Sequence, residues 1–246
     1  MFKDYFHNKK AVLFDLDGTV VNSHPLWNEA CIEVASNLGF VWRGLNFFSA
    51  ASLSETWESY LDFTGEDYGV PVSSLVLQTK DKFLSRFLVA SPEEFLQEGF
   101  WAFINELKSE KSMKIGLVTN SDKDVAEKVI NHLNIASVFE TILYGDDVKR
   151  KKPDSEIYEK AIKNLDLKAK EILCFEDAPA GVKSARGAGL TVIGVRNSLF
   201  SERDYPHNLI FVEDFTVFPG NLDRAYKEIL QEQMDQLPPK ESTEDQ

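Results

Sequence analysis

The stretch Ala11-Val12-Leu13-Phe14-Asp15-Leu16-Asp17-Gly18-Thr19 joins an apolar run to two carboxylates and a glycine. A short apolar run of this kind is typical of a buried strand in a parallel sheet. Because side chains alternate along a strand, Asp15 and Asp17 are expected to point to the same side. The stretch therefore predicts a strand whose carboxyl end carries a pair of acids, with Gly18 allowing a tight turn out of it.

Similar apolar runs recur along the chain, and from Lys114 onward they alternate with helical patterns. This alternation is typical of a parallel sheet covered by helices on both faces. We therefore predict an α/β fold with a Rossmann-like parallel core. The apolar runs are Ala11–Leu16, Lys114–Val118, Thr141–Tyr144, Glu171–Phe175 and Thr191–Val195, with a weaker sixth at Leu209–Val212, and the helical patterns are Asp122–Leu133, Ser155–Leu165 and Ala178–Ala188.

The segment between the first two apolar runs is far longer than one crossover connection needs. It contains amphipathic helical patterns at Pro25–Leu38, Leu53–Phe63 and Val72–Val89. These patterns predict an all-helical cap domain, residues 23–90, inserted into an α/β core that comprises residues 1–22 and 91–234.

Two further helices are expected in the core. One covers Pro92–Lys108, with Ser91 as its N-cap and a proline in its first position. The other is the helical pattern Leu222–Met234. The residues 235–246 that follow are polar and lack an apolar face, so we expect a disordered tail there.

The composition is acidic, because 40 Asp and Glu against 27 Lys and Arg leave a formal net charge of −13. Such a charge repels nucleic-acid phosphates and anionic membranes, so we expect no nucleic acid and no membrane as partner. The amino-terminal residues show no apolar segment of a leader, and the spacing of Cys31 and Cys174 is unlike that of a metal knuckle or redox pair. We expect a cytoplasmic protein with reduced cysteines that is a monomer or a weak homodimer.

Three other polar segments lie where strands are predicted to end or helices to begin. Thr119-Asn120-Ser121-Asp122 places hydroxyl and backbone N–H groups at a helix start, an arrangement that binds anions or simply caps the helix. Glu176-Asp177 puts two acids at the end of another strand. The basic run Lys149-Arg150-Lys151-Lys152 precedes Pro153, which restricts the backbone and could aim one ammonium group into a cleft, although such runs are usually solvated.

Each of these segments also has a purely structural explanation, such as an acidic turn, a helix cap or a solvated surface. Their shared position favours a functional one, because all of them fall at one edge of the predicted parallel sheet. Ligands of such sheets bind beyond the carboxyl ends of the strands. Together the segments indicate a site for phosphate and a metal ion.

The same segments resemble, in order, the four motifs of the haloacid dehalogenase-like superfamily. The similarity spans about Ala11 to Val195, and its last motif is close to the phosphoglucomutase-like and phosphoglycolate-phosphatase-like branch. Members of that branch have a helical cap inserted after the first strand, as is predicted here. The matching segments are Asp15-Leu16-Asp17-Gly18-Thr19, Thr119, Lys152-Pro153 and Glu176-Asp177-Ala178-Pro179-Ala180-Gly181-Val182.

The resemblance implies a Mg²⁺-dependent phosphatase that hydrolyses a small phosphorylated metabolite through an aspartyl-phosphate intermediate. Asp15 would be the nucleophile, and Asp17 would act first as the acid and then as the base. The phosphoryl oxygens would be bound by Thr119, Asn120 and Lys152.

The resemblance also implies a metal site built from oxygen ligands, which Mg²⁺ prefers. Asp15, the backbone carbonyl of Asp17, Asp177 and Glu176 would supply these ligands. The substrate phosphate would complete the coordination shell.

Departures from the family pattern bear on the reaction. Hexose-phosphate mutases of this branch carry a histidine where Trp27 stands, which argues against mutase activity. Dehalogenases and phosphonatases lack an aspartate at the position of Asp17. Two alternatives stay open: a sugar-phosphate mutase of the same branch, and a catalytically silent binding or regulatory module, for which Asn22, at a position commonly Asp, is the sequence hint.

Substrate recognition is expected from the cap, because the core residues named above contact only the phosphoryl group that all substrates share. Trp42 and Arg43 are candidates for lining the interface between cap and core, although an aromatic and an arginine after a helix also pack or solvate without a function. The cap is expected to close about hinges near Asn22–His24 and Ser91. His24, beside the first of these hinges, could contact substrate, although an ordinary surface histidine is the commoner case. The identity of the substrate does not follow from the sequence.

Overall fold

The computed structural model describes residues 3–42, 52–65, 69–109 and 112–218. Within these residues, six parallel strands form one sheet in the order β3-β2-β1-β4-β5-β6. The chain therefore builds outward from β1 to one side and then to the other. The strands are β1 (Ala11–Phe14), β2 (Lys114–Val118), β3 (Thr141–Leu143), β4 (Ile172–Glu176), β5 (Thr191–Val195) and β6 (Ile210–Val212).

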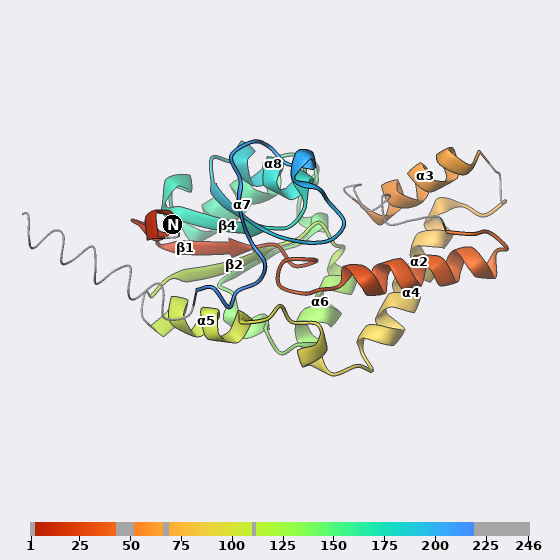
Figure 1. The fold of residues 1–246 in the computed structure, drawn as a ribbon, viewed down its shortest axis with the longest axis horizontal. Coiled ribbons are helices and arrows are strands. Elements are labelled where there is room, and N and C mark those ends of the chain that lie inside the picture. The colour runs from red at the N-terminus through yellow and green to blue at the C-terminus, as the bar shows by residue number, and fades with distance from the viewer. Residues whose placement is uncertain (1–2, 43–51, 66–68, 110–111, 219–246) are drawn as a thin grey trace, which may run out of the picture.

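Both faces of the sheet are covered by helices, as Figure 1 shows. The alternation along β1 sends Val12 and Phe14 into a hydrophobic cluster with α5 and α6, and Ala11 and Leu13 into a second cluster with α7 and α8. All four of these side chains are fully buried. The predicted α/β fold with a Rossmann-like parallel core is thus confirmed. The helices are α5 (Phe100–Ser109), α6 (Lys123–His132), α7 (Glu156–Leu165) and α8 (Pro179–Gly187).

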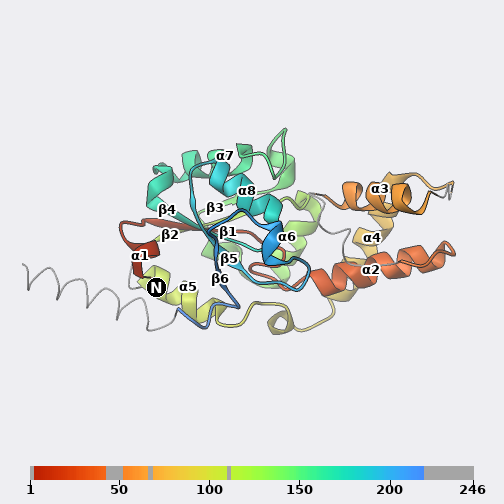
Figure 2. The same cartoon turned by 45° about the horizontal axis from the view of Figure 1, so that its top comes forward.

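Three helices, α2 (His24–Asn37), α3 (Leu53–Thr64) and α4 (Val72–Phe87), lie between β1 and β2 and are called the cap below. Figures 1 and 2 show them to one side of the core, in the direction in which the arrow of β1 points. They enclose a separate apolar cluster that includes Trp57, Tyr60 and Leu75. The inserted helical patterns of the sequence are therefore found as helices within one or two residues of their predicted bounds.

Two linkers connect the cap to the core, and they pair with each other. The backbone N–H of Asn22 donates to the carbonyl of Phe95 (2.8 Å), and that of Gln97 donates to the carbonyl of Val20 (3.0 Å). An isolated β-bridge between Val21 and Leu96 lies between these two bonds. The linkers thus form one short paired hinge.

This pairing corrects the predicted helix Pro92–Lys108. Only Pro92–Glu94 form a turn of 3₁₀ helix after Ser91, and α5 begins at Phe100. The backbone of the intervening residues forms the hydrogen bonds of the hinge instead of those of a helix. Gly99 also has a φ of +79°, outside the helical region. Tertiary pairing therefore overrides the local helical pattern.

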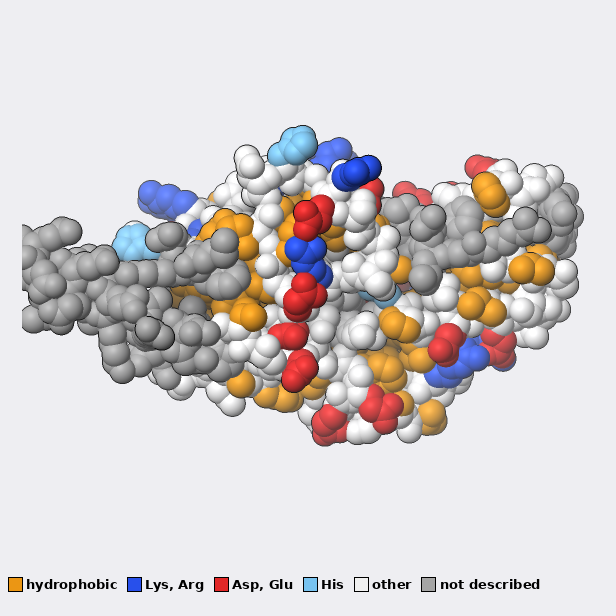
Figure 3. Space-filling model, in the orientation of Figure 1, with side chains coloured by type: hydrophobic (Ala, Val, Ile, Leu, Met, Phe, Trp, Pro, Cys, Tyr) orange, Lys and Arg blue, Asp and Glu red, His pale blue; other side chains and the backbone are white. Residues whose placement is uncertain are grey.

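The face of the molecule in Figure 3 carries acidic, basic and hydrophobic side chains over both the core and the cap. Cys31 and Cys174 are buried and unbridged, as expected. Among the described helices, none has the length and apolar character of a membrane span. The predicted helix Leu222–Met234, the tail 235–246 and Arg43 lie outside the described residues.

Candidate active site

The polar segments predicted at the sheet edge do come together at the carboxyl ends of β1, β2 and β4. Asp15 and Thr119 follow β1 and β2 directly, while Glu176 ends β4 and is followed by Asp177. Because β1 pairs with both β2 and β4, these ends are adjacent. β1 and β4 are also where the strand order reverses its direction, the usual place for a ligand in such a sheet.

A buried lysine lies at the centre of this edge. The Nζ of Lys152 contacts Asp15 Oδ1 (2.6 Å), Glu176 Oε1 (2.5 Å) and the carbonyl oxygen of Val118 (2.9 Å). Its neighbour Lys151 binds Asp122 at the edge of the site, and the exposed Arg150 binds Asp154. One cation of the basic run is thus directed inward, as the proline after it predicted.

Asn120 holds the backbone of Lys152 in place. Its side-chain amide donates to the Lys152 carbonyl (3.1 Å), and its side-chain oxygen accepts from the Lys152 N–H (2.9 Å). Thr119, 1% exposed, accepts a hydrogen bond from the N–H of Ser121 (3.0 Å) with its hydroxyl oxygen, which orients the hydroxyl. The side chain of Asn120 therefore positions the lysine, and the predicted role of Asn120 toward phosphate stays a prediction.

Too many negative groups are buried here for one lysine to balance. Asp15, Glu176 and Asp177 are at most 7% exposed. Burial raises the pKa of Asp15 well above its usual range, Lys152 opposes this shift, and the neighbouring carboxylates add to it. Burial raises the pKa of Glu176 in the same way. Burial alone would lower the pKa of Lys152, but the two carboxylates that it contacts hold that pKa above its ordinary value. Lys152 is therefore charged, and full ionisation of the three acids leaves a net charge of −2.

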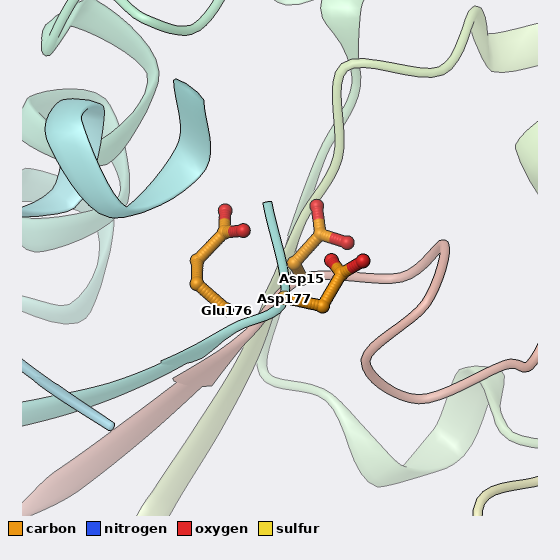
Figure 4. Close-up of side chains that lie close together, drawn as sticks. All are labelled: Asp15, Glu176 and Asp177. Carbon is orange, nitrogen blue, oxygen red and sulfur yellow. The ribbon is translucent and has the colours of Figure 1, made fainter. Parts of the chain in front are cut away.

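A divalent metal ion would balance this excess of buried negative charge. Asp15, Glu176 and Asp177 can each offer a carboxylate oxygen within 4.8 Å of the others, and Figure 4 shows the three side chains beyond the strand ends. A set of oxygen donors alone suits Mg²⁺. Glu176 is also held by the core helix α7, because its Oε1 accepts a hydrogen bond from the Tyr158 hydroxyl (2.5 Å) beside its contact with Lys152.

Asp177 is held by three side chains. Thr19 donates to its Oδ1 (3.2 Å), while Asn197 (2.5 Å) and His24 (2.9 Å) contact its Oδ2. Gly18 passes so close that a Cβ there would lie 2.0 Å from Asp177 Oδ2, and its φ is +87°. Only glycine fits this turn, which explains the residue after the two acids in the sequence.

Asp17 is turned away from Lys152 toward the cap. Ser23 (2.7 Å) and the indole N–H of Trp27 (3.2 Å) donate to its Oδ1, and Ser121 (2.6 Å) donates to its Oδ2. Trp27 is in turn stacked on Phe83 of α4, with ring centroids 3.7 Å apart. The second acid is thus fixed by groups from the core, the hinge and the cap.

A cleft of about 290 Å³ covers these residues between core and cap. From the cap it is lined by side chains that include Ser54, Thr56 and Lys80, and from the core also by Lys151 and Asp122. Lys80 crosses the cleft to Asp122 (2.7 Å), which also contacts Lys151 (2.7 Å). Polar and cationic groups from both the core and the cap therefore face this cleft, beside apolar ones such as Val76.

Trp42 does not line this cleft, so the structure favours the packing alternative over a place at the interface. It is 9% exposed in the apolar cluster of the cap, stacked on Tyr60 at 4.6 Å, and its indole N–H donates to Asn28 (3.1 Å). The large ring fills the interior of the small cap, which is the structural use of a tryptophan.

His24 is not an ordinary surface histidine, so that alternative was wrong. Its side chain is 17% exposed and lies against Asp177. Sequence reasoning missed Tyr158, Asn197, Ser121 and Lys80 as members of the site. For Ser121 the signal was present, since it follows Thr119-Asn120, whereas the other three lie in segments without a polar motif.

Comparison with known proteins agrees with this geometry. A family model described as haloacid dehalogenase-like hydrolase matches residues 12–195. A phosphorylated carbohydrates phosphatase from Thermotoga maritima is 30% identical over 200 residues, which cover 77% of this chain and 87% of that protein. A beta-phosphoglucomutase from Bacillus subtilis is 28% identical over 190 residues, covering 76% of this chain and 83% of that protein.

A solved structure shares the fold. CbbY from Rhodobacter sphaeroides, in complex with xylulose-(1,5)bisphosphate, matches with a TM-score of 0.73 at 21% identity. The match covers 84% of this chain and 95% of that one. It therefore spans nearly the whole of the related protein.

Proposed function

We propose that this chain, which belongs to the haloacid dehalogenase-like hydrolase family, is a phosphatase that hydrolyses a small phosphorylated sugar through a covalent intermediate on Asp15. The observation that carries the proposal is the contact of Asp15 with Lys152 inside a buried group of carboxylates. A carboxylate that merely stabilised the fold would not need two further uncompensated acids beside it. The phosphatase named for phosphorylated carbohydrates supports the class of substrate.

In the first step a carboxylate oxygen of Asp15 attacks phosphorus, and the bond from phosphorus to the leaving oxygen breaks. Asp17 gives a proton to the leaving oxygen, which departs as an alcohol. In the second step water attacks the phosphorus of the aspartyl-phosphate and gives its proton to Asp17. The phosphorus–oxygen bond to Asp15 breaks, so that phosphate leaves and both carboxyl groups return to their starting state.

The groups around Asp15 would stabilise the transferred phosphoryl group. Lys152 would neutralise charge that the nucleophile and the phosphoryl oxygens share, and the buried hydroxyl of Thr119 would donate to one of these oxygens. Asn120 would act through the backbone of Lys152, which it holds at two points.

Mg²⁺ would be held by Asp15, Asp177 and Glu176, with the carbonyl of Asp17 as a further oxygen. The ion would supply the positive charge that lets Asp15 and the substrate phosphate approach each other. The buried net charge of the acids supports this assignment, because burial disfavours their ionisation unless such a charge is present.

We also propose that Lys80 recognises the sugar part of the substrate. Lys80→Met should lower kcat/KM for sugar phosphates by about 10- to 100-fold, because a hydrogen bond from a charged group is lost in the transition state. The turnover of p-nitrophenyl phosphate, which lacks sugar hydroxyl groups, should change far less. Lys82→Met is the matched control, since Lys82 lies on the same helix but pairs with Glu33 (2.5 Å). An unchanged order of preference over a panel of esters would exclude Lys80 from recognition.

A sugar-phosphate mutase is the second candidate, favoured by the similarity to a beta-phosphoglucomutase. Trp27 argues against mutase activity, because its indole is stacked on Phe83 and occupies the cap side of Asp17. Incubation with hexose 1-phosphates separates the two activities. A phosphatase releases inorganic phosphate in proportion to the substrate consumed, whereas a mutase yields the isomeric 6-phosphate. A silent binding module would give neither product.

A further inference from the structure

We propose that His24 is a positioning residue through which the cap controls metal binding by the core. The inference rests on the proposed function, since it takes Asp177 to be a ligand of the metal ion. His24 is the first residue of the cap helix α2, whereas Asp177 follows β4 of the core. Their side chains meet with His24 Nε2 at 2.9 Å from Asp177 Oδ2.

The contact is directional. A carboxylate oxygen can accept but not donate, so Nε2 of His24 carries the proton and donates it to Asp177. Gly18 leaves the space for this contact, because a Cβ at Gly18 would lie 2.4 Å from His24 Nε2. The turn after the two acids thus accommodates both the carboxylate and the histidine that orients it.

Asp177 receives its remaining side-chain hydrogen bonds from the core. Thr19 belongs to the loop after β1 and donates to Oδ1, and Asn197 follows β5 and donates to Oδ2. His24 is therefore the one side-chain donor to this carboxylate, among the hydrogen bonds of the described residues, that a cap helix provides. Moving α2 would remove it and leave the other two in place.

Contacts between the cap helices make α2 and α4 move together. Trp27 of α2 is stacked on Phe83 of α4, and Glu33 of α2 is paired with Lys82 of α4 (2.5 Å). The hinge pairs Val21 with Leu96 just before α2 begins. A rotation about this hinge would carry α2 and α4 together, and His24 would move relative to Asp177.

Side chains that hold a metal ligand from behind fix its orientation, and their loss typically weakens metal binding. If the donor to Asp177 comes from the cap, then metal affinity is higher when the cap is in the position described here. Linkage requires the reverse as well: bound metal must favour that position of the cap. Through His24, metal binding would thus stabilise this position of the cap, and this position of the cap would strengthen metal binding.

The test is a calorimetric titration of the full chain with Mg²⁺ alone, without substrate. His24→Leu removes the donor and should raise the dissociation constant by about 10- to 100-fold. His24→Gln places an amide N–H near the position of Nε2 and should bind Mg²⁺ much more tightly than the leucine variant. If His24 only stabilised the fold, the glutamine variant would bind Mg²⁺ no more tightly than the leucine variant when both have the same thermal stability.

Hydrogen exchange provides the second measurement. In the wild type, Mg²⁺ should slow exchange of the paired hinge amides of Asn22 and Gln97, and in His24→Leu at saturating Mg²⁺ this protection should be smaller. Equal Mg²⁺ affinities of the wild type and the leucine variant would overturn the proposal while leaving the phosphatase assignment intact. A wild type that hydrolyses phosphate esters but binds no Mg²⁺ would overturn the metal assignment, and this proposal with it.

Discussion

Asp15→Asn should abolish phosphatase turnover, with a loss of several orders of magnitude in kcat. A neutral amide is a poor nucleophile toward phosphorus. The other cleft carboxylate that contacts Lys152 is Glu176, whose Oε1 also accepts from Tyr158, so we do not expect it to replace Asp15. The measurement is release of p-nitrophenolate and of inorganic phosphate under saturating substrate. Appreciable turnover by this variant would rule out covalent catalysis by Asp15.

Asp17→Asn is the matched comparison, because it removes the other carboxylate of the same turn. An aryl phosphate has a leaving group that needs little help from an acid, so the first step should survive in this variant. The second step needs Asp17 as base and should become slow. Intact-protein mass spectrometry should then find one phosphoryl group on Asp17→Asn and none on Asp15→Asn.

The loss in Asp15→Asn should not come from unfolding. Burial and the neighbouring carboxylates already oppose ionisation of Asp15, so the amide removes an unfavourable charge. Lys152 keeps its contacts with Glu176 and the carbonyl of Val118. We expect a melting temperature in the absence of metal that equals or exceeds that of the wild type.

Much of the fold was predictable because its signals are local. The apolar runs and the helical patterns between them fix the strands and most helices, and the long insertion after the first run indicates the cap. The start of α5 was not predictable, because residues after Pro92 have a helical pattern but pair with Val20 and Asn22 in the hinge. A partner that is remote in sequence leaves no trace in a local pattern.

The site was predictable to the extent that its residues follow strands. Asp15, Thr119 and Glu176 are brought together by the pairing of β1 with both neighbours, which any parallel sheet of this order would produce. Tyr158 and Asn197 reach the same acids from a helix and from the loop after β5, within ordinary sequence. Their roles depend on packing rather than on a motif. Trp42 shows the converse case, because an aromatic residue near a cap can line a cleft or fill the interior of the cap, and the sequence alone does not decide which.

Removal of divalent metal should eliminate turnover, and added Mg²⁺ should restore it. Three buried carboxylates face one lysine, and without a further cation their mutual repulsion and burial oppose both ionisation of Asp15 and binding of a phosphate dianion. Activity measured after treatment with chelator, and again with increasing Mg²⁺, checks this expectation. Full activity after thorough removal of metal would contradict it.

The ion should also stabilise the fold. A ligand that binds only the native state adds about 2.7 kcal/mol at a concentration 100 times its dissociation constant. Mg²⁺ should therefore raise the melting temperature of the wild type without any substrate present.

Asp177→Ala tests whether Asp177 binds the ion directly or only attracts it by its charge. Alanine leaves the donors Thr19, Asn197 and His24 unpaired, so each variant is compared with its own metal-free form. Asp177→Ala should lose most of the stabilisation by Mg²⁺ and need far more Mg²⁺ for activity. Asp122→Asn is the control, since it removes the same charge from the same cleft at a residue that pairs with Lys80 and Lys151. Its Mg²⁺ requirement should stay close to that of the wild type. Equal shifts in the two variants would mean that the cleft attracts cations by charge alone and that Asp177 does not bind the ion.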